Sequence, residues 1–342
     1  MRINEDRFTL RHYAAFSIIT LLALGLCVGI GSVNIPILDV FRIIFESIVS
    51  GKISGTTSSI IMSVRLPRVL NVALVGGALA LCGAAMQGLL RNPLADGSTL
   101  GVSSGAALGA VLAIALDITI PAIPLAGTVV MAMLFAFISI LFILSMSHKL
   151  DYSLSTNTII LLGVIYSMFV SSISSFIIVF ASNKVESITF WQMGSLSGST
   201  YKGAIIIGTI LLIFGANILI RSRELDAFAI SEKNAQHIGV DVKRTKLVIM
   251  LSVSAIIGVC VAFSGTIGFV GLIIPHILRR FVGPSHRKLL VASLFGGAVF
   301  LLFADLIART VLSPIELPIG VVTSFVGSIL FVYIFYNMRK VK

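Results

Sequence analysis

The stretch PRVLNVALVGGALALCGAAMQGLL, residues 67–90, decides the class of fold. After Arg68 it carries no charged residue until Arg91, and about 20 apolar residues are enough for a helix to cross a bilayer. Four small residues recur at every fourth position along it: Gly76, Ala80, Ala84 and Gly88. A stripe of small residues lets two membrane helices approach closely, so the stretch predicts a membrane-spanning helix that packs against another.

The rest of the chain repeats this pattern. Apolar stretches lie at about 13–32, 67–90, 99–116, 122–147, 156–181, 203–220, 246–264, 267–282, 289–308 and 317–338. The chain is 57% hydrophobic and 11% charged, whereas a soluble domain is about 25% charged. This composition excludes an ordinary cytosolic enzyme and a disulfide-stapled module. It predicts an all-α, multi-pass membrane protein with about ten spans in a single domain, residues 1–342.

The positions of the basic residues predict the orientation. With ten spans and both termini in the cytoplasm, 18 of the 25 Lys and Arg residues face the cytoplasm and 7 face outward. Cytoplasmic segments of membrane proteins carry this excess, so we expect a chain in the cytoplasmic (plasma or inner) membrane with both termini inside. The net charge of +11 is then a topology signal, and it does not indicate nucleic-acid binding.

Two hydrophilic segments stand out from the apolar stretches. The segment at about 221–246 has charges of both signs and is predicted to form one or two short cytoplasmic helices. The segment at about 32–64 is predicted to be extracellular, with an amphipathic part around 37–48 that lies along the membrane surface. Either segment could instead be an ordinary solvated loop.

The sequence lacks the motifs of a membrane enzyme. It contains no H-E-x-x-H zinc motif and no G-x-x-x-x-G-K-[ST] loop for ATP. Asp305 and Arg309, four residues apart, are open to a functional or a structural reading. The three cysteines lie far apart in apolar runs, and we expect neither a metal site nor a cofactor bound by this chain. A pore with neither a relay of acidic residues nor an ATP-binding loop of its own would draw its energy from another subunit.

Several motifs carry a resemblance to a known family. They are RLPR at 65–68, MQGLLRNPLA at 86–95, LGVSSGA at 100–106, GFVGLIIPH at 268–276, ADLIAR at 304–309 and ELPIGVVT at 316–323. By these motifs the chain resembles the FecCD-like permeases of type II ABC importers for iron-siderophores, haem and cobalamin. The motifs occur in the same order as in that family and extend over nearly the whole chain. Gly97 departs from the family pattern, which usually has Pro there, and this loosens the turn expected at the cytoplasmic surface.

The resemblance implies partners and site residues. It implies a homodimer, or a heterodimer with a related permease, together with two cytoplasmic ATPases that bind ATP and Mg, and an extracytoplasmic binding protein or lipoprotein. Arg65, Arg68 and Arg309 match the positions that dock the binding protein, although arginines can also anchor helix ends by snorkelling. A second group matches the segment that contacts the ATPase: Ala235, Ile238, Gly239 and Asp241.

A third group of residues is expected to shape the helix contacts or the gate. Gly101, Gly105 and Gly109 form a small-residue stripe, Gly268 and Gly271 belong to the family motifs, and Pro275 and Pro318 interrupt late spans.

We therefore expect an import permease for an iron chelate, most simply an Fe(III)-siderophore, that works by alternating access. Haem or cobalamin is the alternative cargo within the family. An ion-driven secondary transporter and a membrane-embedded enzyme are the other classes.

Overall fold

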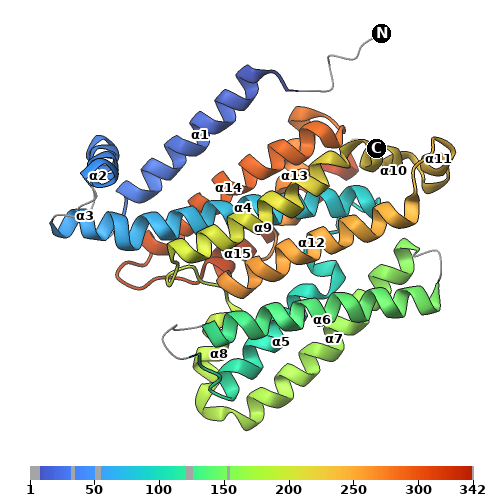
Figure 1. Ribbon diagram of the computed structural model, residues 1–342, viewed down its shortest axis with the longest axis horizontal. Helices are drawn as coiled ribbons and strands as arrows, with labels where there is room; N and C mark the ends of the chain where they lie inside the picture. The colour runs from blue at the N-terminus through green and yellow to red at the C-terminus, as the bar shows by residue number, and fades with distance from the viewer. Residues whose placement is uncertain (1–7, 32–34, 51–54, 121–125, 152–154, 341–342) are drawn as a thin grey trace.

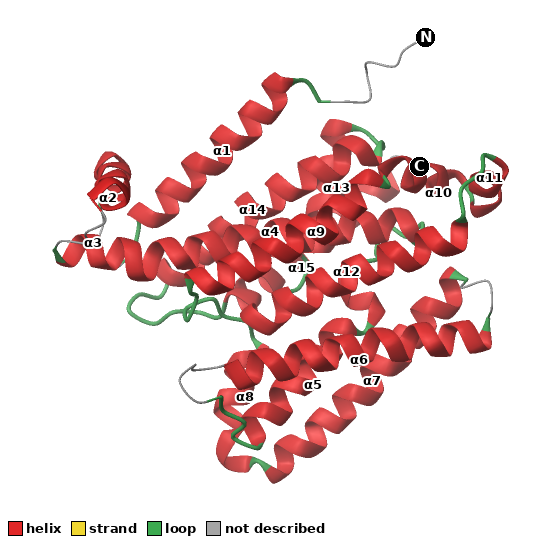
Figure 2. Ribbon diagram, viewed as in Figure 1, coloured by secondary structure: helices red, strands yellow, loops and turns green. Residues whose placement is uncertain are grey.

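The computed structural model describes residues 8–31, 35–50, 55–120, 126–151 and 155–340, and every regular element in these residues is helical (Figure 2). The long helices are α1 (Leu10–Gly29), α4 (Leu66–Leu89), α6 (Ala126–Leu150), α7 (Thr156–Phe180), α9 (Tyr201–Ile220), α12 (Val242–Ser264), α14 (His286–Thr310) and α15 (Ile319–Lys340). The shorter helices are α2 (Ile37–Ser50), α3 (Thr56–Ile60), α5 (Val102–Ala115), α8 (Val185–Gln192), α10 (Ser222–Ile230), α11 (Glu232–His237) and α13 (Val270–Val282). A π-helical turn, Ile61–Arg65, joins α3 to α4, and 3-10 turns lie at Gly97–Leu100 and Ser182–Lys184.

Each of the ten predicted apolar stretches contains one helix. Seven helices in the described residues are long and apolar enough to cross a membrane, and the first turns of α4 extend back to Thr56 to make a 34-residue helical run. The sequence prediction of a multi-pass α-helical membrane protein is therefore confirmed. The helices α5 and α13 are the exceptions in length, because 13 or 14 residues extend only about 20 Å and a hydrocarbon core is about 30 Å thick.

Helix α4 forms the centre of the bundle. It packs against α14, α13, α12 and α9, and most of its side chains are buried, so its small residues serve contacts on several sides. A Cβ on Gly76 would collide with the carbonyl oxygen of Gly297 in α14, and one on Gly77 would lie 2.7 Å from that of Leu294. The quartet α5, α6, α7 and α8 lies beside this core in Figure 1.

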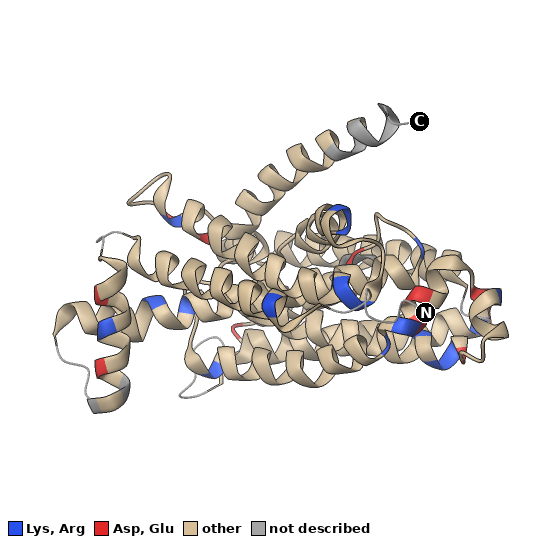
Figure 3. Ribbon diagram, turned by 90° about the horizontal axis from the view of Figure 1, so that it is seen from above, with Lys and Arg blue, Asp and Glu red and all other residues tan. Residues whose placement is uncertain are grey.

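The two ends of the bundle differ in what they carry. The start of α1 and the end of α15 lie toward the same end of the molecule as α10 and α11, which we call the inner end (Figure 1). Helices α2, α3 and α8 lie at the other end, the outer end, and Lys, Arg, Asp and Glu are more frequent toward both ends than between them (Figure 3). These names follow the predicted orientation, which places the inner end in the cytoplasm.

Helix α2 occupies the predicted outer loop and lies across the end of the bundle rather than along it (Figure 1). Val40 is buried against the protein, whereas Leu38, Phe41 and Phe45 are exposed. Exposed apolar side chains on a short helix of this kind suit a membrane interface, and the position along the membrane surface stays a prediction. Residues 32–34 and 51–54 of the predicted 32–64 loop lie outside the described residues.

Candidate functional site

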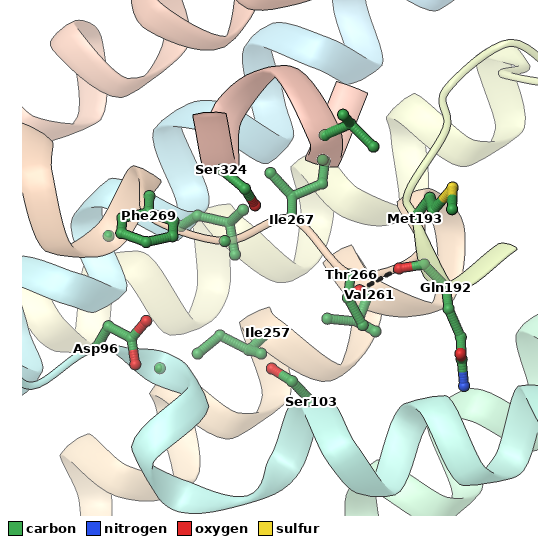
Figure 4. Close-up of a pocket in the computed structure, with 16 residues that line it drawn as sticks. Asp96, Ser103, Gln192, Met193, Ile257, Val261, Thr266, Ile267, Phe269 and Ser324 are labelled. Carbon is green, nitrogen blue, oxygen red and sulfur yellow. Dashed lines mark hydrogen bonds between the residues drawn. The ribbon is translucent and has the colours of Figure 1, made fainter. Parts of the chain in front are cut away.

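A cavity of about 510 Å³ lies where six helices, α4, α5, α8, α12, α13 and α15, meet the segments that precede α5 and α13 (Figure 4). It is lined by Leu79, Asp96, Gly97, Ser103, Gln192, Met193, Ile257, Val261, Thr266, Ile267, Gly268, Phe269, Gly271, Gly320, Val321 and Ser324. Asp96 and Ser103 are drawn on one side of it and Ser324 on the other, with Ile257 between them (Figure 4). Most of the wall is apolar, glycine or hydroxyl-bearing, and Asp96 and Gln192 are its charged and amide side chains.

The two half-length helices explain how this cavity forms. The segment that precedes α5 ends at Gly101, whose φ of 67° is left-handed, and the segment that precedes α13 begins at Gly265, whose φ is 66°. Non-helical backbone inside a membrane is tolerated where it is buried in protein or lines a cavity, and both segments line this one. A pair of unwound segments facing one hollow is therefore the principal candidate for a translocation path.

This arrangement corrects one expectation. The turn around Gly97 was expected at the cytoplasmic surface, but Gly97 is buried and lies against Ile257, well inside α12. A Cβ at this position would overlap the end of the Ile257 side chain, which would have to shift to make room. The connection from α4 to α5 thus re-enters the bundle, and this is why α5 is short.

Pro275 lies within α13 and leaves it continuous, because the groups that the proline frees are bound by another helix. Proline removes the bond that the Gly271 carbonyl would accept four residues earlier. The Gln87 side-chain amide of α4 donates to the Gly271 and Leu272 carbonyls at 3.3 and 3.1 Å, while its oxygen accepts from Arg279 Nη2 at 3.0 Å. Sequence reasoning missed Gln87, although a polar residue in an apolar span was the available signal.

The other residues predicted to shape helix contacts lie in distinct settings. Gly105 and Gly109 lie against α6, where a Cβ would meet Ser139 and the Met131 carbonyl respectively. A Cβ on Gly271 would lie 2.8 Å from the Leu79 carbonyl of α4, but one on Gly268 would meet only Ser324 Oγ, at 3.8 Å. Pro318 precedes the first residue of α15 and does not interrupt that helix, because the helix begins after it.

An ion-pair cluster joins α4 to α14 at the outer end. Arg68 Nε donates to Asp305 Oδ1 at 3.0 Å, and Arg309 Nε lies 2.9 Å from Asp305 Oδ2. Arg68 Nη1 also donates to Glu316 Oε2 at 2.8 Å. Asp305 is buried, whereas the Glu316 side chain is 47% exposed. Glu316 is therefore the member of the cluster that water or a partner can reach most easily.

Two arginines also hold the carbonyl end of α1. Arg65, only 5% exposed, donates from Nη1 to the Val28 and Gly29 carbonyls at 2.9 and 3.1 Å. Arg309 Nη2 donates to the Cys27 carbonyl at 2.9 Å. Cations at a helix C-terminus satisfy carbonyls that the helix cannot pair itself. Arg65, Arg68 and Arg309, which are far apart in the sequence, thus come together at one end and bind groups of this chain.

Helices α10 and α11 form a folded segment at the inner end. Ile238 is 72% exposed, and the exposed Gly239 that follows has a φ of 87°, which ends the short helix. The Asp241 carboxylate accepts from the Arg244 amide and caps α12. Ala235 is fully buried against this chain, so it packs the segment onto the bundle and leaves Ile238 and its neighbours on the outer face.

Polar contacts fasten this segment to the bundle. Lys246 Nζ of α12 lies 2.8 Å from Glu232 Oε1 of α11, and Thr245 Oγ1 donates to Glu224 Oε2 of α10 at 2.7 Å. His286, the first residue of α14, places Nδ1 2.7 Å from Asp226 Oδ1 of α10. The sequence placed Lys246 at the edge of a charged loop and gave no sign that it is buried.

A bundle of apolar helices around an internal cavity, with ion-paired clusters at its two ends, is typical of multi-pass membrane transport subunits. The comparisons with known proteins agree, since the model of the FecCD transport family matches residues 18–337. The chain therefore belongs to the FecCD transport family, whose members are ABC permeases of the cytoplasmic membrane. Such a permease is a transport subunit rather than an enzyme, and ATP is hydrolysed by a separate subunit of the transporter.

Individual relatives extend this result along the whole chain. An uncharacterized ABC transporter permease, YvrB of Bacillus subtilis (strain 168), is 40% identical over 99% of both chains. The hemin transport permease HmuU of Yersinia pestis is 34% identical over 94% of this chain and 95% of its own. A structure described as an inward-facing metal-chelate type ABC transporter has a TM-score of 0.84 at 30% identity and covers 96% of this chain and 100% of its own. Other relatives are named for iron chelatin, cobalamin and molybdate.

Proposed function

We propose that this permease imports an Fe(III)-siderophore by alternating access between the two sides of the membrane. The observation that carries the proposal is the cavity between the two unwound segments, because its mostly apolar wall, with glycines, hydroxyl groups and a single carboxylate (Asp96), suits a bulky chelate that must pass through without being held. The iron travels inside its organic ligand, so the protein needs no metal ligand of its own. Haem and cobalamin are the alternative cargoes.

The working transporter in this proposal is a dimer of this chain, or of this chain and a related permease, with two ATPases at the inner end and a binding protein at the outer end. ATP and Mg bind to the ATPases. High affinity for the cargo belongs to the binding protein.

Reconstitution tests the proposal. The permease, its ATPase and its binding protein are placed in liposomes and offered radiolabelled ferric siderophores, haem and cobalamin in separate reactions. ATP-dependent accumulation of a ferric siderophore supports the proposal. Accumulation of haem or cobalamin alone would show that this compound, and not a siderophore, is the cargo. Uptake that persists without ATP and ATPase would indicate an ion-driven secondary transporter instead. Chemical conversion of a lipid or peptide by the permease alone would indicate an enzyme.

Docking at the outer end is proposed to use the arginines of the ion-pair cluster. Arg68 already binds Glu316, so a carboxylate of the binding protein would have to replace Glu316 on the guanidinium group. The planar guanidinium group of Arg68 can donate to the carboxylate of Glu316 or to one of the binding protein with the same geometry. The half-exposed Glu316 is the easier of the two acidic partners to displace, since Asp305 is buried.

We expect Glu316→Gln to strengthen binding-protein docking roughly fivefold, since a half-exposed ion pair is worth about 1 kcal/mol or less. Surface plasmon resonance on the detergent-purified transporter measures the Kd. Glu46→Gln, which breaks the exposed Arg42–Glu46 pair on α2, is the matched control and should leave the Kd unchanged. Weaker docking of Glu316→Gln would contradict this role of Arg68.

Contact with the ATPase at the inner end is proposed to use the face around Ile238 and Gly239. We expect Ile238→Asp to weaken ATPase association by roughly 30-fold, as for an apolar residue central to an interface. Ile315, 69% exposed at the outer end, supplies the control Ile315→Asp. Co-purification of the ATPase with each variant measures the effect, and equal retention by both variants would exclude Ile238 from the contact.

A further inference from the structure

Two consecutive residues of α12 hold both helices of the inner segment. Lys246 binds Glu232 at the start of α11, and Thr245 binds Glu224 in α10. Lys246 is 1% exposed, and lysine is almost never fully buried unless it is paired. Thr156 at the start of α7 also donates to Glu232 Oε1, at 3.4 Å. Polar contacts therefore join the start of α12 to the inner segment, beside the buried apolar side chains of Leu225, Phe228 and Ala235.

The Glu232–Lys246 contact lies on the helix that also lines the cavity. Helix α11 has an outer face around Ile238 and an inner face that contains the buried Ala235 and the Glu232–Lys246 pair. Helix α12 continues from Lys246 into the bundle and contributes Ile257 and Val261 to the cavity wall. One rigid helix thus connects the segment at the inner end with the proposed path.

We propose that the Glu232–Lys246 ion pair is a positioning contact that makes α11 and α12 move as one body, and so couples ATP hydrolysis to movement of the cavity wall. This inference rests on the proposed function. Without the pair, α11 still binds the ATPase through its outer face, but its displacement is no longer passed to α12. ATP is then hydrolysed without a matching transport step.

The test compares Lys246→Met with wild type in the reconstituted transporter. Methionine fills a similar volume, and Glu232, 27% exposed, can be hydrated when its partner is lost. We expect the amount of radiolabelled ferric siderophore imported per ATP hydrolysed to fall roughly tenfold, within the usual range of coupling between sites, while ATPase association is unchanged. Lys149→Met, at an exposed lysine on the inner end of α6, should keep the wild-type ratio. The charge-swapped pair Glu232→Lys with Lys246→Glu should restore part of it.

A second measurement needs neither cargo nor a stable Lys246 variant. Spin labels at Gln236→Cys in α11 and Leu251→Cys in α12 report whether the two helices move together, and the three native cysteines are buried. We expect the distance between the labels to stay constant when a non-hydrolysable ATP analogue is added to the wild-type complex. A distance that changes in wild type, or an unchanged import ratio in Lys246→Met, would overturn the inference. A wild-type permease that binds no ATPase would instead overturn the proposed function.

Discussion

Replacing Asp305 by Asn should lower the free energy of unfolding by about 3–5 kcal/mol, because it leaves the buried guanidinium groups of Arg68 and Arg309 without the carboxylate between them. Asparagine has nearly the same size as aspartate, so the effect is one of charge. The midpoint of heat-induced unfolding in detergent measures it. We also expect less assembled transporter in the membrane, since the outer ends of α4 and α14 meet at this residue.

Glu316→Gln is the matched control, because it removes the other carboxylate bound to Arg68. Its side chain is half exposed, and such a pair contributes no more than about 1 kcal/mol. If Asp305→Asn were as stable as Glu316→Gln, burial of a carboxylate would not determine how much its ion pairs contribute to the free energy of unfolding.

Gly83→Ala should destabilise the protein by about 1–3 kcal/mol and also reduce transport. A Cβ on Gly83 would overlap the backbone of Gly271 in α13, and backbone cannot move aside as the end of a flexible side chain can. Helix α13 would have to retreat from α4, and its first turns form part of the cavity wall. Heat-induced unfolding and ATP-dependent uptake, measured on the same preparation, test both parts of the prediction.

Gly208→Ala in α9 provides the comparison, because it makes the same chemical change in open space. A Cβ there would meet only Leu74, at 3.8 Å. Alanine has the higher helix propensity, so stability should be unchanged or slightly greater. A loss of stability at position 208 equal to that at position 83 would point to glycine flexibility rather than to close packing.

Much of the fold could be predicted from the sequence, because a segment that crosses the hydrocarbon core of a membrane is usually a helix of about 20 mostly apolar residues. Each of the ten apolar stretches coincides with one helix. The lengths of α5 and α13 could not be predicted, since hydropathy reports that a segment avoids water and not how deep it lies. Gly97 is the clearest example: its turn seemed polar enough for the surface, yet it packs inside against Ile257.

The candidate site was predictable only where its contacts are local. Asp305 and Arg309 are four residues apart and could be paired on one helix face, but Arg68 joins them across 237 residues, and no pattern in a single sequence reports such a contact. The same limit applies to the hydrogen bonds from Gln87 to α13 and to the ion pair between Lys246 and Glu232. Each is a polar residue beside or within an apolar stretch whose partner lies on another element.

The hold of Arg65 and Arg309 on α1 also bears on how the chain is made. Arg309 and the Ile30 carbonyl that it contacts are 279 residues apart. At about 5–20 residues per second, a ribosome needs roughly 15–60 s to synthesise that interval. During this time α1 has Arg65 but not Arg309 at its carbonyl end. The contacts that secure the end of α1 are thus completed only after most of the chain that separates them has been made.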